Sequence, residues 1–248
     1  GDIITKVADT DVQNSTPSIV SNLIKSTNGT TTIEVLRGGV YKTLEINVEK
    51  VSIPSVSSNN FDGVGYIKIT TFSNNTYEQF KTALSSLEKE SIDSLVIDVR
   101  NNGGGFLNAA VDIAELFIEK GKNIYGLETK EKTEYYKDST KESRKYKVGI
   151  LLNSASASAS EILAAALKES YGATLLGLTS YGKGTVQETS ELETGGMIKY
   201  TTAYWLTPNG NKINNVGLKP DVEITGDYND DMDYESDTQL LTAIKNMK

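Results

Sequence analysis

The sequence contains no histidine and no cysteine among its 248 residues. Without cysteine, disulfide bonds and thiolate chemistry are excluded. A zinc site would have to rely on carboxylates alone, which is unusual for this metal. If the protein is a hydrolase with a protein nucleophile, we therefore expect that nucleophile to be a serine. The base that activates the serine is then not an imidazole.

The sequence also lacks a basic charge excess and any long apolar run. Its net charge is −8, from 25 basic and 33 acidic residues, which argues against nucleic acid or an anionic membrane surface as the main partner. No run of about 18 apolar residues is present, so no segment is expected to span a bilayer. No signal peptide is visible, and the strand-like start at Gly1–Ile4 suggests a beginning inside a domain. The hydrophobic residues, 38% of the chain, suffice for a sizeable core.

Residues 1–50 predict a small module with little core of its own. Proline directly after a capping threonine is typical of a helix start, and two alternating segments around Gly38-Gly39 are typical of a hairpin. The expected elements are a strand over Asp2–Val7, a helix from Thr16-Pro17, and strands over Thr31–Leu36 and Tyr41–Val48.

Residues 51–226 predict the main domain, and residues 227–248 predict an acidic linker followed by a C-terminal helix. Within the main domain, residues 51–60 are interpreted as a connector and Glu128–Lys147 as a solvated excursion. The pattern then alternates strands with helices. Strands are expected over Gly63–Ile69, Ser94–Val99, Lys147–Leu152 and Ala173–Leu178; helices over Thr76–Glu90, Leu107–Lys120 and Ser160–Glu169; and a hairpin over Met197–Leu206, with a turn at Pro208–Gly210 and a return strand. Thr76 and Gln79 have capping-box spacing.

This order predicts an α/β fold, a mixed sheet with βαβ units. Three loops of small residues follow directly after buried strands, and right-handed crossovers make such strands parallel. The C-terminal ends of parallel strands lie at one edge of a sheet, where ligands bind. Gly103–Gly105, Ser158 and Lys183 are therefore expected to converge.

Ser158 lies in an alternating Ala/Ser run between an apolar strand and a helix. The run could be a flexible linker, but its position favours a tight bend. Ser158 and Glu161 have the spacing of a helix-capping box, and Ser160 could also cap the helix. Capping and catalysis are compatible, because a helix N-terminus favours developing negative charge.

Lys183 stands between two glycines, which allow close backbone approach and special dihedral angles. A lysine is most often a solvated surface charge. To act as a base, a lysine must lose its proton from a reference pKa of about 10.4, and burial in an apolar pocket favours that loss. Gln187 could orient the amine without adding charge.

The glycine run in Asn101–Gly105 has two interpretations. A phosphate-binding loop is disfavoured, because the G-x-x-x-x-G-K-[ST] pattern is absent and no basic residue follows. Consecutive glycines can instead present backbone N–H groups to an oxyanion. Asp98 and Arg100 are expected to hold this loop in place rather than to do chemistry.

Six carboxylates and no basic residue occupy Asp227–Asp237. Asp227, Asn229 and Asp231 have calcium-loop spacing, but Met232 stands where the loop requires glycine. A solvated linker is the preferred interpretation, and no metal or cofactor is expected.

Five segments, in order and at fitting spacings, resemble the carboxyl-terminal processing (tail-specific) serine peptidases. They are Asp98–Gly105, Ser156–Glu161, Tyr181–Gln187, Thr207–Gly210 and Gly217–Asp221. Residues 1–50 resemble the later part of the PDZ module that precedes the peptidase core in that family. The resemblance implies a crotonase/ClpP-like core and a serine endopeptidase with a Ser–Lys dyad, which recognises protein substrates by their C-terminal tails.

Carried over by motif, the resemblance makes Ser158 the nucleophile, Lys183 the general base and Gln187 the residue that positions Lys183. The backbone N–H groups of Ala159, and of Gly104 or Gly105, would form the oxyanion hole. It implies no cofactor, metal or nucleic acid, is compatible with a homo-oligomer, and implies an extracytoplasmic place in the bacterial cell envelope, membrane-anchored or secreted.

The sequence departs from the family pattern at three places. Ala155 stands where glycine is usual, Gly103 stands where proline is common, and the front of the PDZ module is missing, including its carboxylate-binding loop and a groove strand. Two other functions stay open. One is a catalytically inactive PDZ-type scaffold that binds peptides, and the other is a crotonase-like acyl-transfer enzyme that uses only a glycine oxyanion hole.

Overall fold

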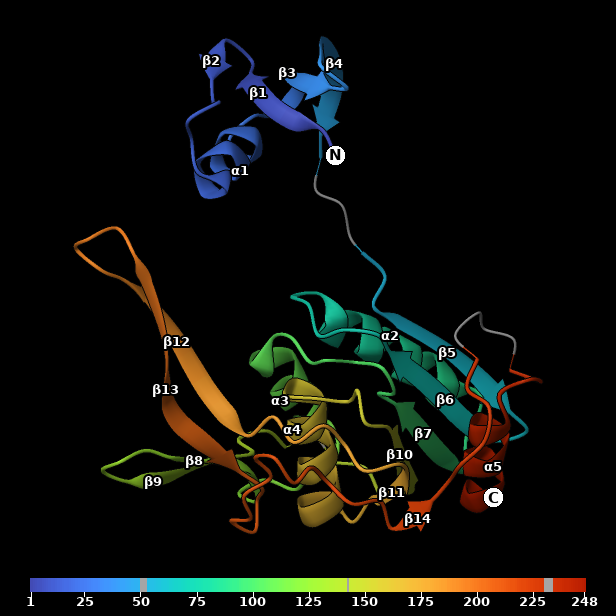
Figure 1. The fold of residues 1–248 in the computed structure, drawn as a ribbon. Coiled ribbons are helices and arrows are strands. Elements are labelled where there is room, and N and C mark those ends of the chain that lie inside the picture. The colour runs from blue at the N-terminus through green and yellow to red at the C-terminus, as the bar shows by residue number, and fades with distance from the viewer. Residues whose placement is uncertain (50–52, 142, 230–233) are drawn as a thin grey trace. The chain divides into compact units, whose positions relative to one another are not determined.

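The computed structural model describes residues 1–49, 53–141, 143–229 and 234–248 and divides into two units, Gly1–Ile53 and Pro54–Lys248 (Figure 1). The first unit is a four-stranded sheet with one helix: the helix and three of the strands are as the sequence predicts, and the short strand β2 was not predicted. Its strand order is β2-β1-β3-β4. The elements are β1 (Ile3–Val7), β2 (Thr10–Asp11), α1 (Pro17–Lys25), β3 (Gly29–Arg37) and β4 (Val40–Val48).

A six-stranded mixed sheet forms the centre of the second unit, in the order β14-β11-β10-β7-β6-β5. Every neighbouring pair is parallel except β5 and β6, which are antiparallel. The expected mixed α/β architecture is therefore confirmed. The strands are β5 (Val56–Phe61), β6 (Val64–Ile69), β7 (Ser94–Asp98), β10 (Lys147–Leu152), β11 (Thr174–Gly177) and β14 (Val222–Glu223).

Helices cover both faces of this sheet, which explains why its central strands are apolar throughout. Leu95 and Ile97 of β7 belong to the larger core cluster, whereas Val96 between them packs on the opposite side with the C-terminal helix. The larger cluster contains α2 (Thr76–Lys89), α3 (Leu107–Glu115) and α4 (Ala159–Ala166), and the smaller one contains α5 (Thr238–Met247). A π-helical turn, η1 (Leu167–Tyr171), continues α4.

A second sheet in this unit has the order β12-β13-β8-β9. Figure 1 shows β12 and β13 as a long hairpin that extends away from the six-stranded sheet. The strands are β8 (Asn123–Glu128), β9 (Thr133–Lys137), β12 (Thr185–Glu191) and β13 (Met197–Leu206). β12 is an edge strand, and it begins two residues after Lys183.

Three sequence predictions about the chain between the motifs are wrong. The expected connector contains β5, whose serines and asparagines suit a half-buried edge strand. Glu128–Lys147 contains β9, which pairs with β8 and stacks Tyr136 on Tyr125. β13 pairs with the upstream strand β12, because residues 192–196 form the turn that joins them. The expected return strand is only a bridge between Leu206 and Lys212.

Two helix boundaries also differ. The capping residue of α2 is Asn75, so the expected capping box of Thr76 and Gln79 is wrong. The Thr76 hydroxyl and the Gln79 carboxamide instead contact Ser55. Helix α3 ends at Glu115 rather than Lys120, because the next apolar residues turn back into the core.

Residues 230–233, which include Asp231 and Met232 of the calcium-loop pattern, lie outside the described residues. The C-terminal helix is present as α5, and the Asp237 carboxylate caps it by accepting a hydrogen bond from the Leu240 N–H at 2.8 Å. Among the helices described, none has the length and apolar character needed to cross a membrane.

Candidate active site

The three small-residue loops follow β7, β10 and β11 and meet at one edge of the six-stranded sheet. The Ala157 N–H donates to the Asn102 carbonyl at 3.0 Å, which joins the serine loop to the glycine loop. The Tyr181 N–H donates to the Ser156 carbonyl at 3.0 Å, which joins the lysine loop to the serine loop. The expected convergence of these loops is confirmed.

The structure distinguishes among the four serines of the Ala/Ser run. Ser156 and Ser160 are buried, and their hydroxyls donate to the Val99 and Asn102 carbonyls at 2.7 and 2.8 Å. Ser154 is exposed. Ser158 is half-buried and lines a cavity. Two of these serines therefore hold the loop together, and Ser158 is the one that faces a space where a ligand can bind.

Ser158 also has an unusual backbone, with φ 57° and ψ −116° at the start of α4. A non-glycine residue in such a region costs about 1–3 kcal/mol and persists only when its surroundings hold it. Its N–H donates to the Glu161 carboxylate at 2.9 Å, which is one half of the predicted capping box. The N–H of Ala159 follows at the first position of the helix, where the helix dipole favours negative charge.

The glycine loop lies directly against Ser158. A Cβ on Gly104, whose φ is +102°, would lie 2.8 Å from both the Ala157 carbonyl oxygen and the Ser158 Cβ. A Cβ on Gly105 would lie 2.1 Å from the Phe72 carbonyl oxygen. Both positions therefore require glycine.

Of the two glycines proposed for the oxyanion hole, Gly104 donates its N–H to the Asn102 side-chain oxygen at 2.9 Å. That donor is therefore already used. Gly105 lines the same cavity as Ser158, so it is the better candidate of the two.

Two departures from the family motif are accommodated locally. Ala155 is exposed, and its N–H donates to the Asn153 side-chain oxygen at 3.1 Å. Gly103 has no other atom within 4 Å of an added Cβ, so its position tolerates a side chain.

Buried polar side chains hold the glycine loop in place through hydrogen bonds and ion pairs. Asn102 is fully buried, and its amide donates to the Ile69 carbonyl at 2.9 Å. Arg100 is also buried and forms ion pairs with Asp98 and Asp237, each at 2.7 Å. Burial alone would lower the pKa of Arg100, but these two carboxylates hold it above its usual value. The expected structural role of Asp98 and Arg100 is consistent with this network, whereas Asp237 was not predicted.

The glycines beside Lys183 allow its loop to pack against another backbone segment. A Cβ on Gly182 would lie 2.8 Å from the Gly217 nitrogen, and one on Gly184 would lie 2.6 Å from the Asn214 nitrogen. The Lys183 side chain itself is exposed. The apolar burial that would favour loss of the lysine proton is therefore absent in this structure, because only the Lys183 backbone is enclosed.

Ser158, Lys183 and Gln187 all line one cavity of about 290 Å³. A β-bulge in the pairing of β12 with β13 lies at Val186/Gln187, and bulges commonly redirect side chains beside active sites. Lys199 also lines the cavity. The other lining residues are Gly105, Leu107, Ala159, Ile162, Thr185, Val186 and Trp205.

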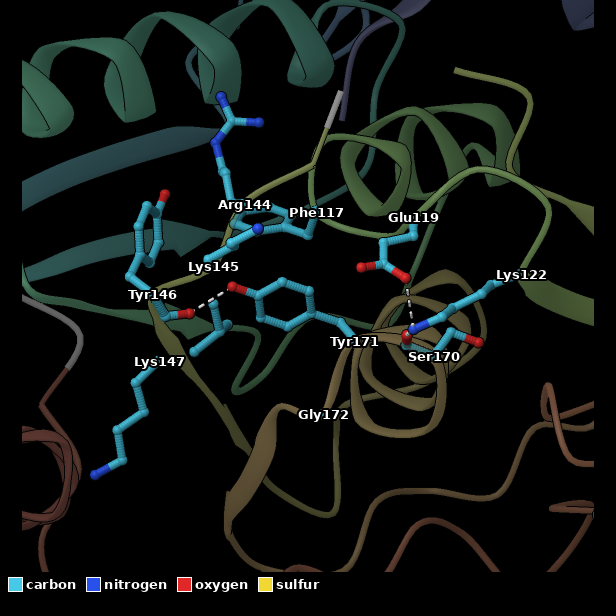
Figure 2. Close-up of a pocket in the computed structure, with 11 residues that line it drawn as sticks. Phe117, Glu119, Lys122, Arg144, Lys145, Tyr146, Lys147, Ser170, Tyr171 and Gly172 are labelled. Atoms are coloured by element: carbon cyan, nitrogen blue, oxygen red, sulfur yellow. Dashed lines mark hydrogen bonds and ion pairs between the residues drawn. The ribbon is translucent and has the colours of Figure 1, made fainter. Parts of the chain in front are cut away.

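A larger cavity, of about 450 Å³, shares no lining residue with this one. Figure 2 shows its side chains, with the Tyr171 hydroxyl directed at the Tyr146 carbonyl and Lys122 close to Glu119. The Lys122–Glu119 ion pair measures 3.3 Å. Size alone therefore does not select the candidate site; the three converging loops do.

Sequence reasoning gave Glu161 only a capping role and missed Asn102 and Trp205. The Glu161 carboxylate accepts hydrogen bonds from both the serine loop and the lysine loop. The Trp205 indole N–H donates to the Lys183 carbonyl. Periodicity could not reveal these contacts, because they join segments that are distant in sequence.

The comparison with protein families agrees with these motifs. The model described as Peptidase family S41 matches residues 63–224, which include all three loops. The chain belongs to peptidase family S41. The family match does not extend to residues 1–62, so it leaves the PDZ resemblance of the first unit untested.

Curated relatives of this S41 chain are named as proteases. A probable CtpA-like serine protease of Staphylococcus aureus (strain N315) is 39% identical over 227 residues, which cover 90% of this chain and 46% of that protein. The protein of that name from Staphylococcus haemolyticus (strain JCSC1435) is 37% identical over the same length. The chain thus spans about half the length of the curated relatives it matches.

Solved structures share the fold. The photosystem II D1 C-terminal processing protease matches with a TM-score of 0.65 and 29% identity, over 90% of this chain and 63% of that chain. A putative S41 protease from Bacteroides fragilis matches with a TM-score of 0.63 over 100% of this chain and 72% of its own. Its identity of 16% supports the fold alone.

Proposed function

We propose that this S41 chain carries the catalytic part of a carboxyl-terminal processing serine endopeptidase, with Ser158 as nucleophile and Lys183 as general base. The observation that carries the proposal is the shared cavity. It holds Ser158, at a strained helix N-terminus, together with an exposed lysine on an enclosed backbone. With no histidine in the chain, lysine is the natural base for a serine nucleophile.

In the proposed acylation step, the neutral Lys183 amine removes the proton from the Ser158 hydroxyl as its Oγ attacks the scissile carbonyl carbon. The new C–O bond gives a tetrahedral intermediate whose oxyanion accepts hydrogen bonds from the N–H groups of Ala159 and Gly105. The C–N bond then breaks, and the Lys183 ammonium returns the proton to the leaving amine. The products are an acyl-enzyme on Ser158 and a peptide with a new N-terminus.

Deacylation repeats these roles with water. Lys183 removes a proton from a water molecule, which attacks the ester carbonyl. The Lys183 ammonium then protonates Ser158 as the second peptide leaves with a new C-terminus. The enzyme returns to its starting state, so the cycle needs no metal or cofactor.

Because Lys183 is exposed in this structure, we propose that bound substrate completes its desolvation. The cavity offers apolar surface for this purpose from Leu107, Ile162, Val186 and Trp205. Covering the amine with a substrate chain disfavours its charged form. Gln187, on the same cavity wall, would orient the amine without adding charge.

Recognition of C-terminal tails is a further part of the proposal. In the first unit, a groove of about 580 Å³ lies between β1 and α1, with apolar surface from Ile3, Ile4, Val20 and Ile24. A strand beside a helix is the setting in which PDZ domains bind extended tails. We propose that residues 1–50 belong to such a module in the whole protein.

We also propose an extracytoplasmic location in the bacterial cell envelope, as the family resemblance implies. The resemblance is compatible with a homo-oligomer as well. Fractionation of cells that produce the whole protein tests the location. Recovery in the cytoplasmic fraction alone would contradict it.

Cleavage of an unfolded protein with an apolar C-terminus, by the whole protein, tests the proposed activity. Ser158→Ala and Lys183→Ala are each expected to abolish cleavage, because each removes one member of the dyad. Replacing the apolar residues of the substrate tail with charged ones is expected to weaken binding instead, because the groove between β1 and α1 offers apolar surface. Cleavage that persists in either variant would refute the dyad. A protein that binds substrate tails but never cleaves them would favour the alternative function of a peptide-binding scaffold.

A further inference from the structure

The backbone around Lys183 is held on both sides by side chains from two other elements. The Lys183 N–H donates to the Glu161 carboxylate of α4 at 2.9 Å. The Lys183 carbonyl accepts from the Trp205 indole N–H of β13 at 2.8 Å. Both peptide groups that flank the Lys183 side chain are therefore fixed, one from each side.

The neighbouring glycines are fixed by the same elements. The Gly182 N–H donates to the Glu161 carboxylate at 2.7 Å, and the Gly184 carbonyl accepts from the Trp205 backbone N–H at 3.1 Å. The Gly182 carbonyl accepts from the Asn215 N–H at 2.8 Å. An exposed surface lysine does not need a backbone enclosed to this degree, so the enclosure points to a defined placement of its amine.

Glu161 connects this segment to the nucleophile. Its side chain is 1% exposed, and one carboxylate oxygen accepts from the N–H groups of both Ser158 and Lys183 at 2.9 Å. The other oxygen accepts from the Ser180 hydroxyl at 2.6 Å as well as from Gly182. An ionised carboxylate has about four acceptor sites, so these four donors use its full capacity.

We propose that Glu161 and Trp205 form a clamp that fixes the distance and direction of Lys183 relative to Ser158. Both are positioning residues, because each acts through the Lys183 backbone. The proposal rests on the proposed function, in which Lys183 is the base for Ser158. Proton transfer requires donor and acceptor within hydrogen-bond reach, so a loosened Lys183 would react more slowly without any loss of binding surface.

The chain contains a single tryptophan, so replacing tryptophan throughout the protein removes only the Trp205 indole N–H from the clamp. Expression of this chain with 3-benzothienylalanine in place of tryptophan substitutes sulfur for the indole N–H and keeps the shape of the ring. We expect the rate at which a fluorophosphonate probe phosphonylates Ser158, with fluoride as the leaving group, to fall about 3- to 10-fold at saturating probe. The probe concentration for half-maximal rate should stay unchanged, because the ring still lines the cavity.

A matched control distinguishes an effect on the clamp from a general loss of stability. Phe117→Leu removes volume from the fully buried core at a residue that does not line the candidate site. It should lower the melting temperature and leave the saturating labelling rate unchanged. A labelling rate in the analogue protein equal to that of the parent, or a rate lowered equally by Phe117→Leu, would overturn the clamp.

Glu161→Gln tests the other side of the clamp. An amide presents an N–H₂ group where the carboxylate accepts hydrogen bonds, so we expect labelling of Ser158 to slow by more than about 10-fold. Combined with the tryptophan analogue, the loss should be smaller than the product of the single losses, since both act on one residue. Fully multiplicative losses would contradict a shared clamp.

The proposed function fails separately from the clamp. If Lys183→Ala labels at the parent rate, Lys183 is not the base, and both proposals are refuted. If Lys183→Ala abolishes labelling while the tryptophan analogue has no effect, the dyad stands and the clamp alone is refuted.

Discussion

At the residue scale, backbone geometry decides which side chains can do chemistry. Ser158 has a positive φ that most serines avoid, and Glu161 binds its N–H. Lys183 is exposed, yet its backbone is enclosed on both sides. Reactive side chains on tightly held backbones are the arrangement expected where geometry controls reactivity.

Gly104 should be intolerant of any side chain. In Gly104→Ala, the added Cβ would lie 2.8 Å from the Ala157 carbonyl oxygen and from the Ser158 Cβ, at a φ that L-residues rarely adopt. We expect the serine loop to shift and probe labelling of Ser158 to fall at least 100-fold, because misplacement by about 1 Å can cost this much.

Gly103→Ala is the matched control, since nothing lies within 4 Å of its added Cβ. It should label and melt like the parent. Equal behaviour of the two variants would show that contact between Gly104 and the serine loop is unimportant.

At the scale of elements, α5 supports the site from the opposite face of the sheet. Its capping residue, Asp237, pairs with Arg100, which directly precedes the glycine loop. The Arg100 guanidinium also lies 4.6 Å from the centre of the Tyr228 ring. The C-terminal segment and the glycine loop are thus parts of one buried network.

Removing a partner from a buried ion pair is costly, because the remaining charge stays buried. Asp237→Ala should lower the free energy of unfolding by about 3–5 kcal/mol, measured by urea denaturation. Glu134→Ala, which breaks the exposed Lys132–Glu134 pair, should cost about 1 kcal/mol or less. Similar midpoints for the two variants would mean that the Arg100 network contributes little.

The sequence could predict the elements that carry strong local patterns. The sequence predicts β7, β10 and the motif loops after them. A continuous apolar run indicates a strand buried on both faces, whichever elements cover it. β5 and β12 were missed because their polar residues suit edge strands, which resemble loops in sequence. Trp205 could not be assigned, since its role depends on contact with Lys183, a residue on another element.

At the scale of the whole molecule, partly buried carboxylates give the stability a dependence on pH. Burial alone would raise the pKa of Glu88, but hydrogen bonds from Arg144 and Tyr146 hold it below its usual value. Burial raises the pKa of Glu115, and nearby Asp138 and Asp112 raise it further. Glu88 thus stabilises the fold at neutral pH and loses this effect as pH falls through its lowered pKa. Ionised Glu115 destabilises the fold until pH falls below its raised pKa.

Glu88→Gln should therefore lower the free energy of unfolding at pH 7, and Glu115→Gln should raise it. Each effect should stay below about 1 kcal/mol, because both side chains are partly solvated. Both differences should shrink as the pH falls below both pKa values, as measured by urea denaturation at pH 7 and near pH 3. The same sign for both variants at pH 7 would contradict this assignment.

The central claim is that Lys183 is the base for Ser158, and the pH dependence of Ser158 labelling by a fluorophosphonate probe tests it most directly. The rate of fluorophosphonate labelling of the parent should rise with pH as the Lys183 amine loses its proton. Lys183→Ala should lower the rate about 10²–10⁴-fold and remove the rise. A flat profile in the parent through neutral and alkaline pH, or unchanged labelling in Lys183→Ala, would contradict the account.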